Sequence, residues 1–448
     1  MGALYRSFGR TGAPARRAIG ADEAIARLKA GRRQELPLLA YGNGRSYGDS
    51  CLNHSGTLVD MRAKSRILSF DPQTGLLKAE AGAMLADIID LAAPRGWFPA
   101  VVPGTRFVTL GGAIANDVHG KNHHRRGTFG RHVEALTLLR SDGTLHECRA
   151  DQEPELFRAT VGGMGLTGLI LDATIRLMKV GSADVEEEVT AFSSLDEYFA
   201  LAEEADSRNE YAVAWIDQLA TGAAAGRGLL LTANHAREGT FRPAPKAWLS
   251  VPFQPPFNVL NNASIRLFNK AYRWAKQRKS VLEHSGFAGY FFPLDGVRHW
   301  NRLYGPGGLF QHQSVVPEEA ARKAIPAMLS AARAAGQASF LTVLKRFGDV
   351  PSPGLLSFPR PGYTLTLDFP NRGKRTLQLL EKLDEITVAA GGAVNPYKDA
   401  RMGAEVFAAS FPDWQALERT RDPAFMSDFW QRTAMRAGQP VRLGQAAE

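Results

Sequence analysis

The sequence predicts an α+β protein with a first domain over residues 1–180, a second domain over residues 181–391 and a return to the first domain over residues 392–448. At 448 residues the chain is too long for one ordinary hydrophobic core. Near residues 180–189 an acidic run precedes a new series of strand-like and helical segments. These later segments suggest a mixed sheet with helices on one face.

Composition narrows the class of protein. The 54 lysines and arginines against 45 carboxylates give a net charge of +9, which suits anionic partners without choosing among them. Only Cys51 and Cys148 are present, which argues against a disulfide scaffold and excludes a zinc site built on cysteines. There is no segment of signal-peptide type and no run of eighteen apolar residues. We therefore expect a cytoplasmic protein.

The first domain follows from its hydrophobic periodicity. A short amphipathic helix over residues 22–29 leads into an apolar strand over 38–41. Strands at 57–61, 66–71 and 76–81 and a helix at 84–93 come next. Asp142-Gly143 then marks a hairpin between strands at 135–140 and 144–149, because Asp-Gly tolerates the positive φ of such turns. A helix at 153–161 and a strand at 168–178 complete the domain.

Residues 102–133 contain more glycine and more turn-forming residues than the core of a domain requires. A Pro-Gly turn, a Gly-Gly pair and a His-Gly-Lys-Asn-His-His run are interleaved with residues too apolar for a solvent-exposed loop. Glycine lets backbone N–H groups close on a ligand, and successive N–H groups suit anionic oxygens. We expect Gly104, Gly111, Gly112 and Gly120 to cradle a pyrophosphate. A second glycine turn, at residues 42–48, ends a strand and is again compatible with phosphate.

A third glycine turn, over residues 163–168, reads G-x-G-x-x-G. The dinucleotide fingerprint of that form requires a strand, then the glycines, then a helix. Here the predicted order is helix, glycines, strand. The sequence therefore argues against a Rossmann site and leaves these glycines as another place where backbone approaches a ligand.

In the second domain, strands are predicted at 211–217, 228–234, 310–316, 340–347 and 363–369, and helices at 318–335 and 374–390. Residues 239–282 stand apart, because they contain no acidic residue but many lysines and arginines, five prolines and the aromatic Trp248, Phe253 and Phe257. A basic helix bearing Ile265, Phe268 and Tyr272 follows. This segment could be a membrane-surface or lipid-substrate lid, or its aromatic residues could fold back onto the domain and leave a solvated basic face.

Several motifs together resemble a known family. The glycine turns and the C-terminal return resemble the vanillyl-alcohol-oxidase/p-cresol-methylhydroxylase (PCMH) superfamily of FAD enzymes. Within it the chain is similar to the flavin oxidase subunits of decaprenylphosphoryl-β-D-ribose 2′-epimerases. The motifs that carry this similarity run in order along nearly the whole chain: GRSYGDS (44–50), PGTRFVTLGGAIANDVHGKNHH (103–124), GTFGRHV (127–133), ELFRATVGGMGLTG (155–168), WNRLYGPGG (300–308), LSFPRPG (356–362), LDFP (367–370) and YKDAR (397–401).

The resemblance implies a PCMH-type FAD-binding domain in two parts, with a substrate domain inserted before the C-terminal return. It implies oxidation of the 2′-hydroxyl of a polyprenyl-phosphate-linked ribose to a ketone, which a partner NAD(P)H-dependent keto-reductase returns as the arabinose epimer for cell-wall arabinan. Peripheral contact with the inner face of the membrane is expected. Carried over by position, the FAD-binding residues are Gly44, Arg45, Ser46, Tyr47, Gly48, Gly104, Thr105, Gly111, Gly112, Ala113, Asn116, Asp117, Gly120, Gly165 and Lys398.

The same resemblance implies the chemistry of the site. Many members of the superfamily attach FAD through a histidine where this chain has Arg45, so the flavin is expected to be non-covalent. Lys398 matches the lysine beside the flavin and is expected to stabilise negative charge developing at N1/C2=O, while His119 or Tyr47 relays the hydroxyl proton. Further pocket residues implied by position, as substrate-binding groups, are Lys121, Trp215, Gln311, Gln313 and Lys345.

Two positions depart from the family pattern. Thr366 stands where some members have a cysteine, and Asn395 stands where a tyrosine is usual before the lysine. Because hydride transfer does not need the thiol, these changes affect substrate detail rather than FAD chemistry.

Other readings remain open at the level of the sequence. A soluble sugar-alcohol or aldonolactone oxidase of the same superfamily is the alternative, although it offers no use for the basic aromatic segment. Nucleic-acid binding is suggested only by net charge and leaves the glycine turns unexplained. His119, His123 and His124 lie on one irregular loop and are expected to be hydrogen-bonding groups, not ligands of a metal.

Overall fold

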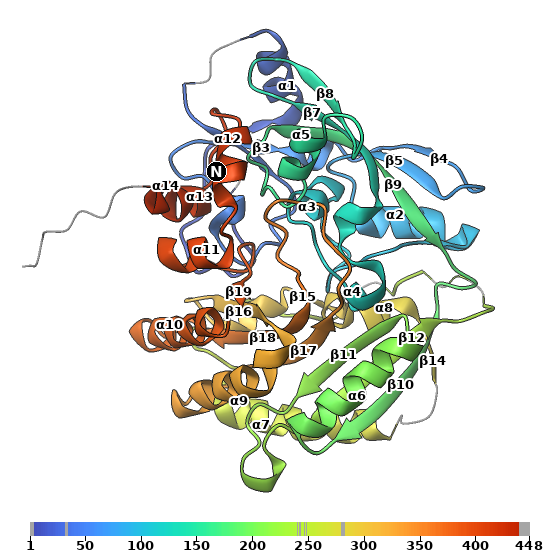
Figure 1. The fold of residues 1–448 in the computed structure, drawn as a ribbon, viewed down its shortest axis with the longest axis vertical. Coiled ribbons are helices and arrows are strands. Elements are labelled where there is room, and N and C mark those ends of the chain that lie inside the picture. The colour runs from blue at the N-terminus through green and yellow to red at the C-terminus, as the bar shows by residue number, and fades with distance from the viewer. Residues whose placement is uncertain are drawn as a thin grey trace, which may run out of the picture.

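The computed structural model describes residues 4–31, 35–239, 241, 243–245, 247, 249–278 and 283–438. Its upper part holds residues of the predicted first domain, its lower part those of the second, and the last helices return to the first (Figure 1). The α+β class is confirmed. The predicted Trp248 lies outside the described residues.

Two sheets build the upper part. The first is parallel, in the order β1-β3-β2, and α1 (Ala21–Lys29) follows its edge strand; its members are β1 (Ala18–Gly20), β2 (Leu38–Tyr41) and β3 (Thr57–Asp60). The second is antiparallel, in the order β4-β5-β9-β7-β8 with β6 also beside β9; its members are β4 (Ile67–Phe70), β5 (Leu76–Glu80), β6 (Trp97–Pro99), β7 (Val133–Leu139), β8 (Leu145–Cys148) and β9 (Leu169–Lys179). The predicted hairpin is confirmed as β7–β8, with Asp142 accepting from the Thr144 amide at 2.9 Å.

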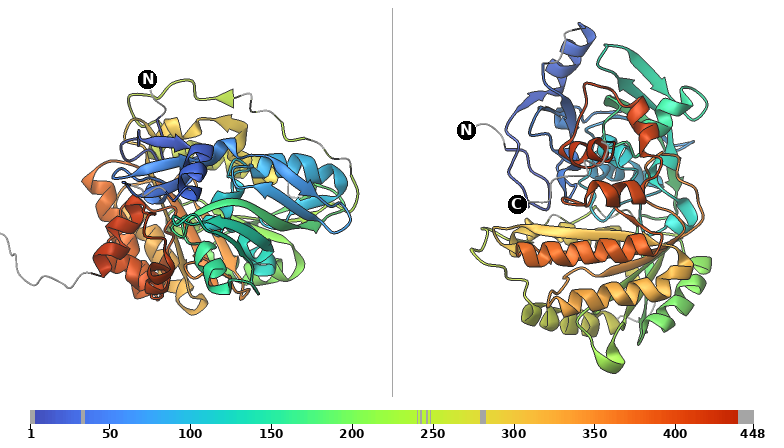
Figure 2. Two further views of the ribbon diagram at one scale, coloured as in Figure 1. Left: turned by 90° about the horizontal axis from the view of Figure 1, so that it is seen from above. Right: turned by 60° about the vertical axis from the view of Figure 1, so that its left-hand side comes forward.

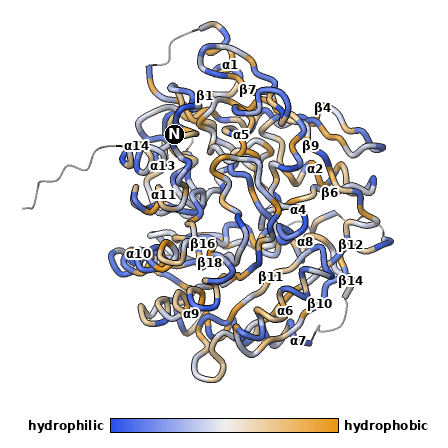
Figure 3. The backbone as a smooth tube through the Cα atoms, in the orientation of Figure 1, coloured by the Kyte–Doolittle hydropathy of each residue, from blue (hydrophilic) through white to orange (hydrophobic). Residues whose placement is uncertain are grey.

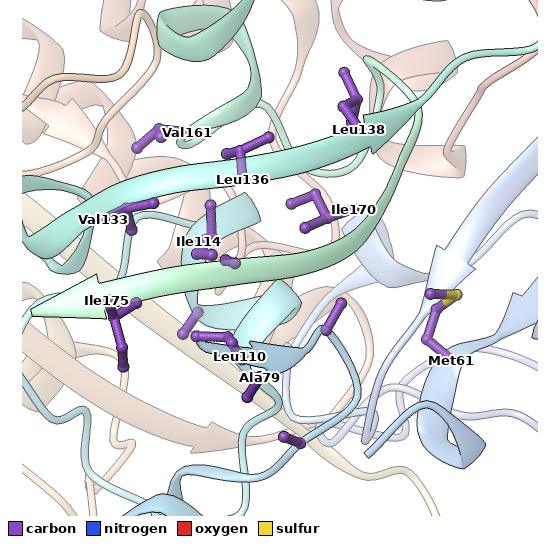
Figure 4. Packing of buried hydrophobic residues seen from close by; sticks show 14 of the residues in the cluster. Met61, Ala79, Leu110, Ile114, Val133, Leu136, Leu138, Val161, Ile170 and Ile175 are labelled. Atoms are coloured by element: carbon purple, nitrogen blue, oxygen red, sulfur yellow. The ribbon is translucent and has the colours of Figure 1, made fainter. Parts of the chain in front are cut away.

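A short helix inside the glycine-rich stretch fills the core of this part. Residues 110–115 were expected only as part of a glycine cradle, but Leu110–Ala115 forms α3. The reason is that Leu110, Ala113 and Ile114 share one helical face and are fully buried, while Thr109 caps the helix by accepting from the Gly112 amide at 3.2 Å. Figure 4 shows Leu110 and Ile114 pointing into the core beneath β7 and β9. Helices α2 (Leu85–Ala92), α4 (His123–Arg126) and α5 (Pro154–Thr160) complete the set.

The lower part is built on one eight-stranded sheet in the order β14-β10-β12-β11-β17-β18-β16-β19. Its strands are β10 (Val185–Phe192), β11 (Tyr211–Ile216), β12 (Gly228–His235), β14 (Glu283–Ser285), β16 (Leu309–Val316), β17 (Val343–Phe347), β18 (Gly362–Pro370) and β19 (Ala393–Val394). Every described pairing in this sheet is antiparallel, so the prediction of a mixed sheet was wrong in this respect. The acidic run at 186–188 lies within β10, the first strand of this sheet along the chain, and so comes just after the predicted boundary at residue 180.

Helices cover one face of this sheet, as predicted. They are α6 (Leu195–Arg208), α9 (Glu318–Ala334) and α10 (Lys374–Ala389), and their apolar faces share one core with β11, β16 and β18. The right-hand view of Figure 2 shows α9 and α10 side by side. The other face meets α7 (Asn262–Gln277) and α8 (Phe287–Phe291), where the rings of Trp215 and Tyr272 are 5.1 Å apart. A small parallel pair, β13 (Leu249–Ser250) and β15 (Val297–Arg298), lies beyond.

The alternation of a strand decides which residues reach that second face. On β11, Ala212, Ala214 and Ile216 pack under the helices, so Val213 and Trp215 face the other way. On β16, Phe310 joins the helical core and Gln311 and Gln313 point to the opposite side. Lys345 on β17 and Thr366 on β18 follow the same rule. Residues far apart in sequence thereby line one wall.

The C-terminal stretch packs against the first part of the chain. Its helices are α11 (Ala404–Ser410), α12 (Trp414–Thr420), α13 (Asp428–Arg432) and α14 (Ala434–Ala437), drawn red beside the blue N-terminal segments in Figure 1. Leu38 exchanges backbone hydrogen bonds with Ala424 and Met426, and Arg432 pairs with Asp49 at 2.8 Å. Of the described residues in this stretch, only the two of β19 pair within the eight-stranded sheet. We therefore keep the three-part division of the chain as a proposal.

Hydrophobic and hydrophilic residues are interleaved along the chain (Figure 3). Of the helices that the structure describes, none is both long and apolar enough to cross a bilayer.

Candidate active site

One cavity of about 710 Å³ lies between the two parts of the molecule, and the three predicted glycine turns meet in its wall. Most of the predicted cofactor residues line it: Gly44, Arg45, Ser46, Tyr47, Gly104, Thr105, Gly111, Gly112, Asn116, Gly120, Gly165 and Lys398. All predicted catalytic and substrate residues line it too: Tyr47, His119, Lys121, Trp215, Gln311, Gln313, Lys345 and Lys398. Segments separated by hundreds of residues therefore converge on one site.

Three predicted cofactor residues do not line the cavity. A Cβ on Gly48 would lie 1.4 Å from the carbonyl oxygen of Asp399, so this glycine permits a close approach of two backbones. Ala113 is fully buried in the core on α3. The carboxylate of Asp117 accepts from Ser357 Oγ at 2.5 Å and from the Gly130 amide at 2.7 Å, which fixes a turn. The contact of these three residues with FAD stays a prediction.

The first two glycine turns offer space and donors that fit FAD. A Cβ on Gly104 would meet no atom within 4 Å, so the cavity is open directly over this backbone. Arg45 lies between the rings of Phe8 and Phe107, at 5.5 and 5.4 Å, and its buried Nε has no hydrogen-bond partner among the residues that the structure describes. An unpartnered buried donor beside open glycine backbone suits the diphosphate of a dinucleotide.

Thr105 contacts Asp295, a residue that the sequence analysis did not single out. Its hydroxyl donates to Asp295 Oδ1 at 2.7 Å, and the Arg106 amide donates to Asp295 Oδ2 at 3.0 Å. Asp295 therefore ties a loop of the first part to the segment after α8. No motif in the sequence pointed to this residue.

Lys398 lies at the meeting point of the C-terminal stretch and the large sheet. Its ammonium group donates to Gln311 Oε1 and lies 4.5 Å from the centre of the Tyr47 ring. Gln311 in turn donates from Nε2 to Asp368 Oδ1 at 2.6 Å. Burial lowers the pKa of Lys398, and the nearby Asp368 carboxylate opposes that shift. Burial likewise raises the pKa of Asp368.

His119 is held by polar groups on both ring nitrogens. Nε2 lies 3.0 Å from Gln313 Nε2, and Nδ1 lies 3.1 Å from the Tyr397 hydroxyl. The ring packs edge-on against Phe347, with centroids 4.9 Å apart. Burial, reinforced by the charges of Lys345 and Lys398, holds the pKa of His119 well below its usual value. The ring is therefore neutral at physiological pH.

Two more lysines lie in the wall without a carboxylate partner among the described residues. Lys121 donates to the carbonyl of Tyr290 and lies 4.1 Å from that ring, and Lys345 Nζ lies 3.4 Å from the carbonyl of Gly120. Burial, as the largest cause, lowers the pKa of each lysine to about 7. The charges of Lys398 and Lys121 add to the lowering at Lys345, whereas the Glu187 carboxylate opposes it at Lys121. This arrangement favours an anionic ligand.

Tyr397 and Asp368 were also missed as individual residues, although both lie inside motifs quoted from the sequence. The remaining histidines of the loop are structural: the His123 ring packs 4.6 Å from that of Phe347, and His124 Nε2 contacts the carbonyl of Asn209 at 3.0 Å. Among the described residues, no group of three or more His, Cys, Asp or Glu side chains could hold a metal ion.

Comparison with known proteins supports FAD as the cofactor. Residues 18–149 match the model of the FAD binding domain. A decaprenylphosphoryl-β-D-ribose oxidase of Mycolicibacterium smegmatis is 36% identical over 416 residues, 88% of each chain. An uncharacterised protein from the mprA 5′ region of Streptomyces coelicolor is 36% identical over 78% of this chain and 99% of its own. The L-gulonolactone oxidase of Mus musculus is 29% identical over only 33% of each chain.

The extent of the first match, together with a cavity whose glycine turns fit FAD, decides the family. The chain belongs to the decaprenylphosphoryl-β-D-ribose oxidase family of PCMH-type FAD-binding oxidases, and it is an FAD-dependent oxidoreductase.

Proposed function

We propose that this enzyme oxidises the 2′-hydroxyl of a polyprenyl-phosphoryl pentose, in the first instance ribose, to the 2′-keto sugar. A separate NAD(P)H-dependent keto-reductase would then complete an epimerisation to the arabinose form. The name of the Mycolicibacterium smegmatis relative supports the pentose and its lipid phosphate. The features of this chain that support them are two lysines without an ion pair among the described residues and the apolar side chains of α7 in the cavity wall.

The lysine pair carries the proposal. Lys121 and Lys345 present positive charge to the cavity without a carboxylate partner among the described residues, whereas Lys276 in the same wall is paired with Glu187 at 2.7 Å. Leaving such charge in a partly apolar cavity is unfavourable until an anion binds. A free pentitol or lactone has no such anion, whereas a phosphodiester does.

The lipid would leave the cavity along α7. Phe268 and Tyr272 on this helix line the cavity, while Leu267 and Trp274 are 72% and 59% exposed. The outer face also carries cationic side chains, and exposed Phe253 and Phe257 precede the helix. Apolar side chains next to cationic ones suit a membrane surface with anionic lipids. Peripheral contact with the cytoplasmic face of the inner membrane is part of this proposal.

When bound, FAD supplies a two-electron acceptor for the hydride of the carbon that carries the hydroxyl. The glycine turns and Arg45 would hold the cofactor, and Lys398 would keep a positive charge where negative charge develops during reduction. His119 and Tyr47 are the two predicted groups for handling the hydroxyl proton. His119 has hydrogen-bond partners on both ring nitrogens, and these decide whether it can accept that proton.

The test is anaerobic bleaching of the flavin by a panel of compounds. Polyprenyl-phosphoryl riboses of different chain length are expected to bleach it, whereas free pentitols and aldonolactones are not. Rapid bleaching by a free sugar alcohol or lactone, with none by the phosphoryl pentoses, would instead establish the soluble oxidase that the L-gulonolactone oxidase match suggests.

We further propose that FAD is bound without a covalent bond, because Arg45 stands where many relatives use histidine for attachment. Acid or heat denaturation of the yellow holoenzyme should release all the FAD into the supernatant. The absorbance of the supernatant and of the washed precipitate measures this. Flavin that stays with the precipitated chain would contradict the prediction.

Removing the exposed apolar groups near α7 should weaken membrane contact. The variant Phe253→Ser/Phe257→Ser/Leu267→Ser/Trp274→Ser is expected to lose sedimentation with anionic liposomes and to use long-chain substrates poorly. Short-chain analogues should still bleach the flavin, because the cavity wall is unchanged. Leu68→Ser/Leu145→Ser, which changes exposed leucines elsewhere, is the control. Equal liposome binding and chain-length preference in both variants would reduce the segment to an ordinary surface.

A further inference from the structure

The buried hydrogen bonds that reach His119 can run in only one direction. They start at the backbone N–H of Tyr397, which can only donate and does so to Asn395 Oδ1 at 3.2 Å. The other end of that amide, Asn395 Nδ2, then donates to Gln313 Oε1 at 2.9 Å. Gln313 Nε2 is thereby left as a donor, to Thr364 Oγ1 and to His119 Nε2, both at 3.0 Å.

Neither amide can be reversed without cost. Turning Asn395 over would set its NH₂ group against the Tyr397 amide N–H. Turning Gln313 over alone would set two NH₂ groups against each other. Asn395 and Gln313 are 0% and 2% exposed, so such a donor would be buried without an acceptor. The fixed backbone N–H therefore sets the polarity of the whole chain of bonds.

This polarity fixes the tautomer of His119. Because Nε2 accepts from Gln313, it carries no proton, and the neutral ring has its proton on Nδ1. An imidazolium would point a second N–H at Gln313, which agrees with the lowered pKa of this histidine. Nδ1–H then donates to the Tyr397 hydroxyl oxygen at 3.1 Å. His119 has no free lone pair left to take a proton from a ligand.

Tyr397 consequently keeps its own hydroxyl hydrogen for another acceptor. Its oxygen accepts from His119. Burial raises the pKa of Tyr397, so the phenol stays protonated. The residue lies in the cavity wall beside Lys398. Asn395 stands where a tyrosine is usual in the family, and here the phenol comes two residues later.

We infer that Tyr397 donates its hydroxyl hydrogen to an oxygen of the ligand in the cavity, and that Asn395, Gln313 and His119 are positioning residues that hold it in this direction. On the proposed function, on which this identification rests, that oxygen belongs to the hydroxyl that becomes the ketone. Both forms of the oxygen accept a hydrogen bond. Tyr397 would thus bind substrate and product and would not act as a base.

The direction can be measured without any substrate. In ¹⁵N-histidine-labelled holoenzyme, the His119 signals are identified by their loss in His119→Gln. We expect a protonated Nδ1 and an unprotonated Nε2 throughout pH 6–8. A proton on Nε2, or an imidazolium in this range, would overturn the inference.

Two variants should reverse the direction. The carboxylate of Asn395→Asp cannot donate, so Gln313 must turn, present its oxygen to Nε2 and draw the His119 proton there. The Gln313→Glu variant should have the same effect by presenting a carboxylate oxygen directly, and it serves if the first variant does not fold. A tautomer unchanged at pH 8 in a folded variant would refute the role of these amides.

The role of the hydroxyl is tested by Tyr397→Phe. We expect flavin reduction by a polyprenyl-phosphoryl ribose to slow on the order of 10²-fold, as for other donors to a reacting oxygen. Asn395→Asp should slow it similarly, because Tyr397 would then donate to His119. Tyr363→Phe, a buried tyrosine that packs 4.9 Å from Phe199 under the helices, is the control. A wild-type rate in Tyr397→Phe would overturn the donor role. A wild-type enzyme that no such substrate reduces would refute the proposed function and leave the tautomer result standing.

Discussion

Replacing Lys398 with alanine is expected to leave FAD bound and to slow flavin reduction on the order of 10²–10³-fold. The diphosphate contacts expected from the open glycine backbone and from Arg45 do not use this side chain. Lys398 instead places a buried positive charge against Tyr47 and Gln311. Such a charge matters most when negative charge develops in the transition state, and its loss therefore lowers the rate rather than the affinity for the cofactor.

The measurement is single-turnover reduction under anaerobic conditions, with the ratio of FAD to protein taken from the absorption spectrum after gel filtration. Lys398→Arg should recover only part of the rate, because a guanidinium is larger and directed differently. The exposed Lys323→Ala on α9 is the control. Since burial lowers the pKa of Lys398, the wild-type rate should fall as pH rises through that pKa, and the alanine variant should lose this dependence. An alanine variant that keeps FAD and reduces at the wild-type rate would make Lys398 structural.

The sequence predicted the parts of the fold that depend on local pattern. The strands predicted at 211–217 and 310–316 are β11 and β16, and the Asp142-Gly143 signal located the β7–β8 hairpin. Position within motifs then brought residues from all three parts of the chain to one cavity. These signals are local, so they survive without knowledge of the tertiary structure.

The errors arose where tertiary contacts override local composition. Gly111 and Gly112 were predicted only as part of a ligand cradle, but burial of Leu110 and Ile114 makes that stretch a helix. The sheet of the second domain was expected to be mixed, yet every described pairing in it is antiparallel. In both cases the packing partners are distant in the sequence.

The directions of the hydrogen bonds could not be predicted from the sequence. Tyr397 and Asn395 were visible within or beside the YKDAR motif, but nothing local shows that one amide N–H sets the tautomer of His119. That requires the register of β16 against β19, which brings Gln313 beside Asn395. The chemistry of such a network can be inferred only from the folded structure.

Removing the charge of Lys121 or Lys345 should affect phosphate-linked substrates alone. Lys121→Met and Lys345→Met keep the length and much of the apolar surface of the side chain. Each is expected to weaken apparent affinity for a polyprenyl-phosphoryl ribose about tenfold to a hundredfold, since a hydrogen bond to a charged group contributes about 1.5–3 kcal/mol. Lys382→Met, exposed on α10 and paired with Glu385, is the control.

The charge of Lys345 should strengthen substrate binding and weaken the stability of the native protein. Burial lowers the pKa of Lys345 to about 7, whereas in the unfolded chain this pKa stays near its usual value of 10.5. Below pH 7 Lys345 is charged in both the folded and the unfolded protein, so the full cost of burying the charge lowers the stability of the native protein. Between pH 7 and 10.5 the unfolded chain binds more protons than the folded one, so the stability of the native protein rises with pH. Lys345→Met should therefore melt at a higher temperature than the wild type at pH 6, with a difference that narrows by pH 9, while affinity of the wild type for the phosphate-linked substrate falls over the same range. Calorimetry and anaerobic titration at both pH values measure these two effects. A variant that is less stable at pH 6, with unchanged affinity, would mean that Lys345 is a packed structural residue and that the anion binds elsewhere.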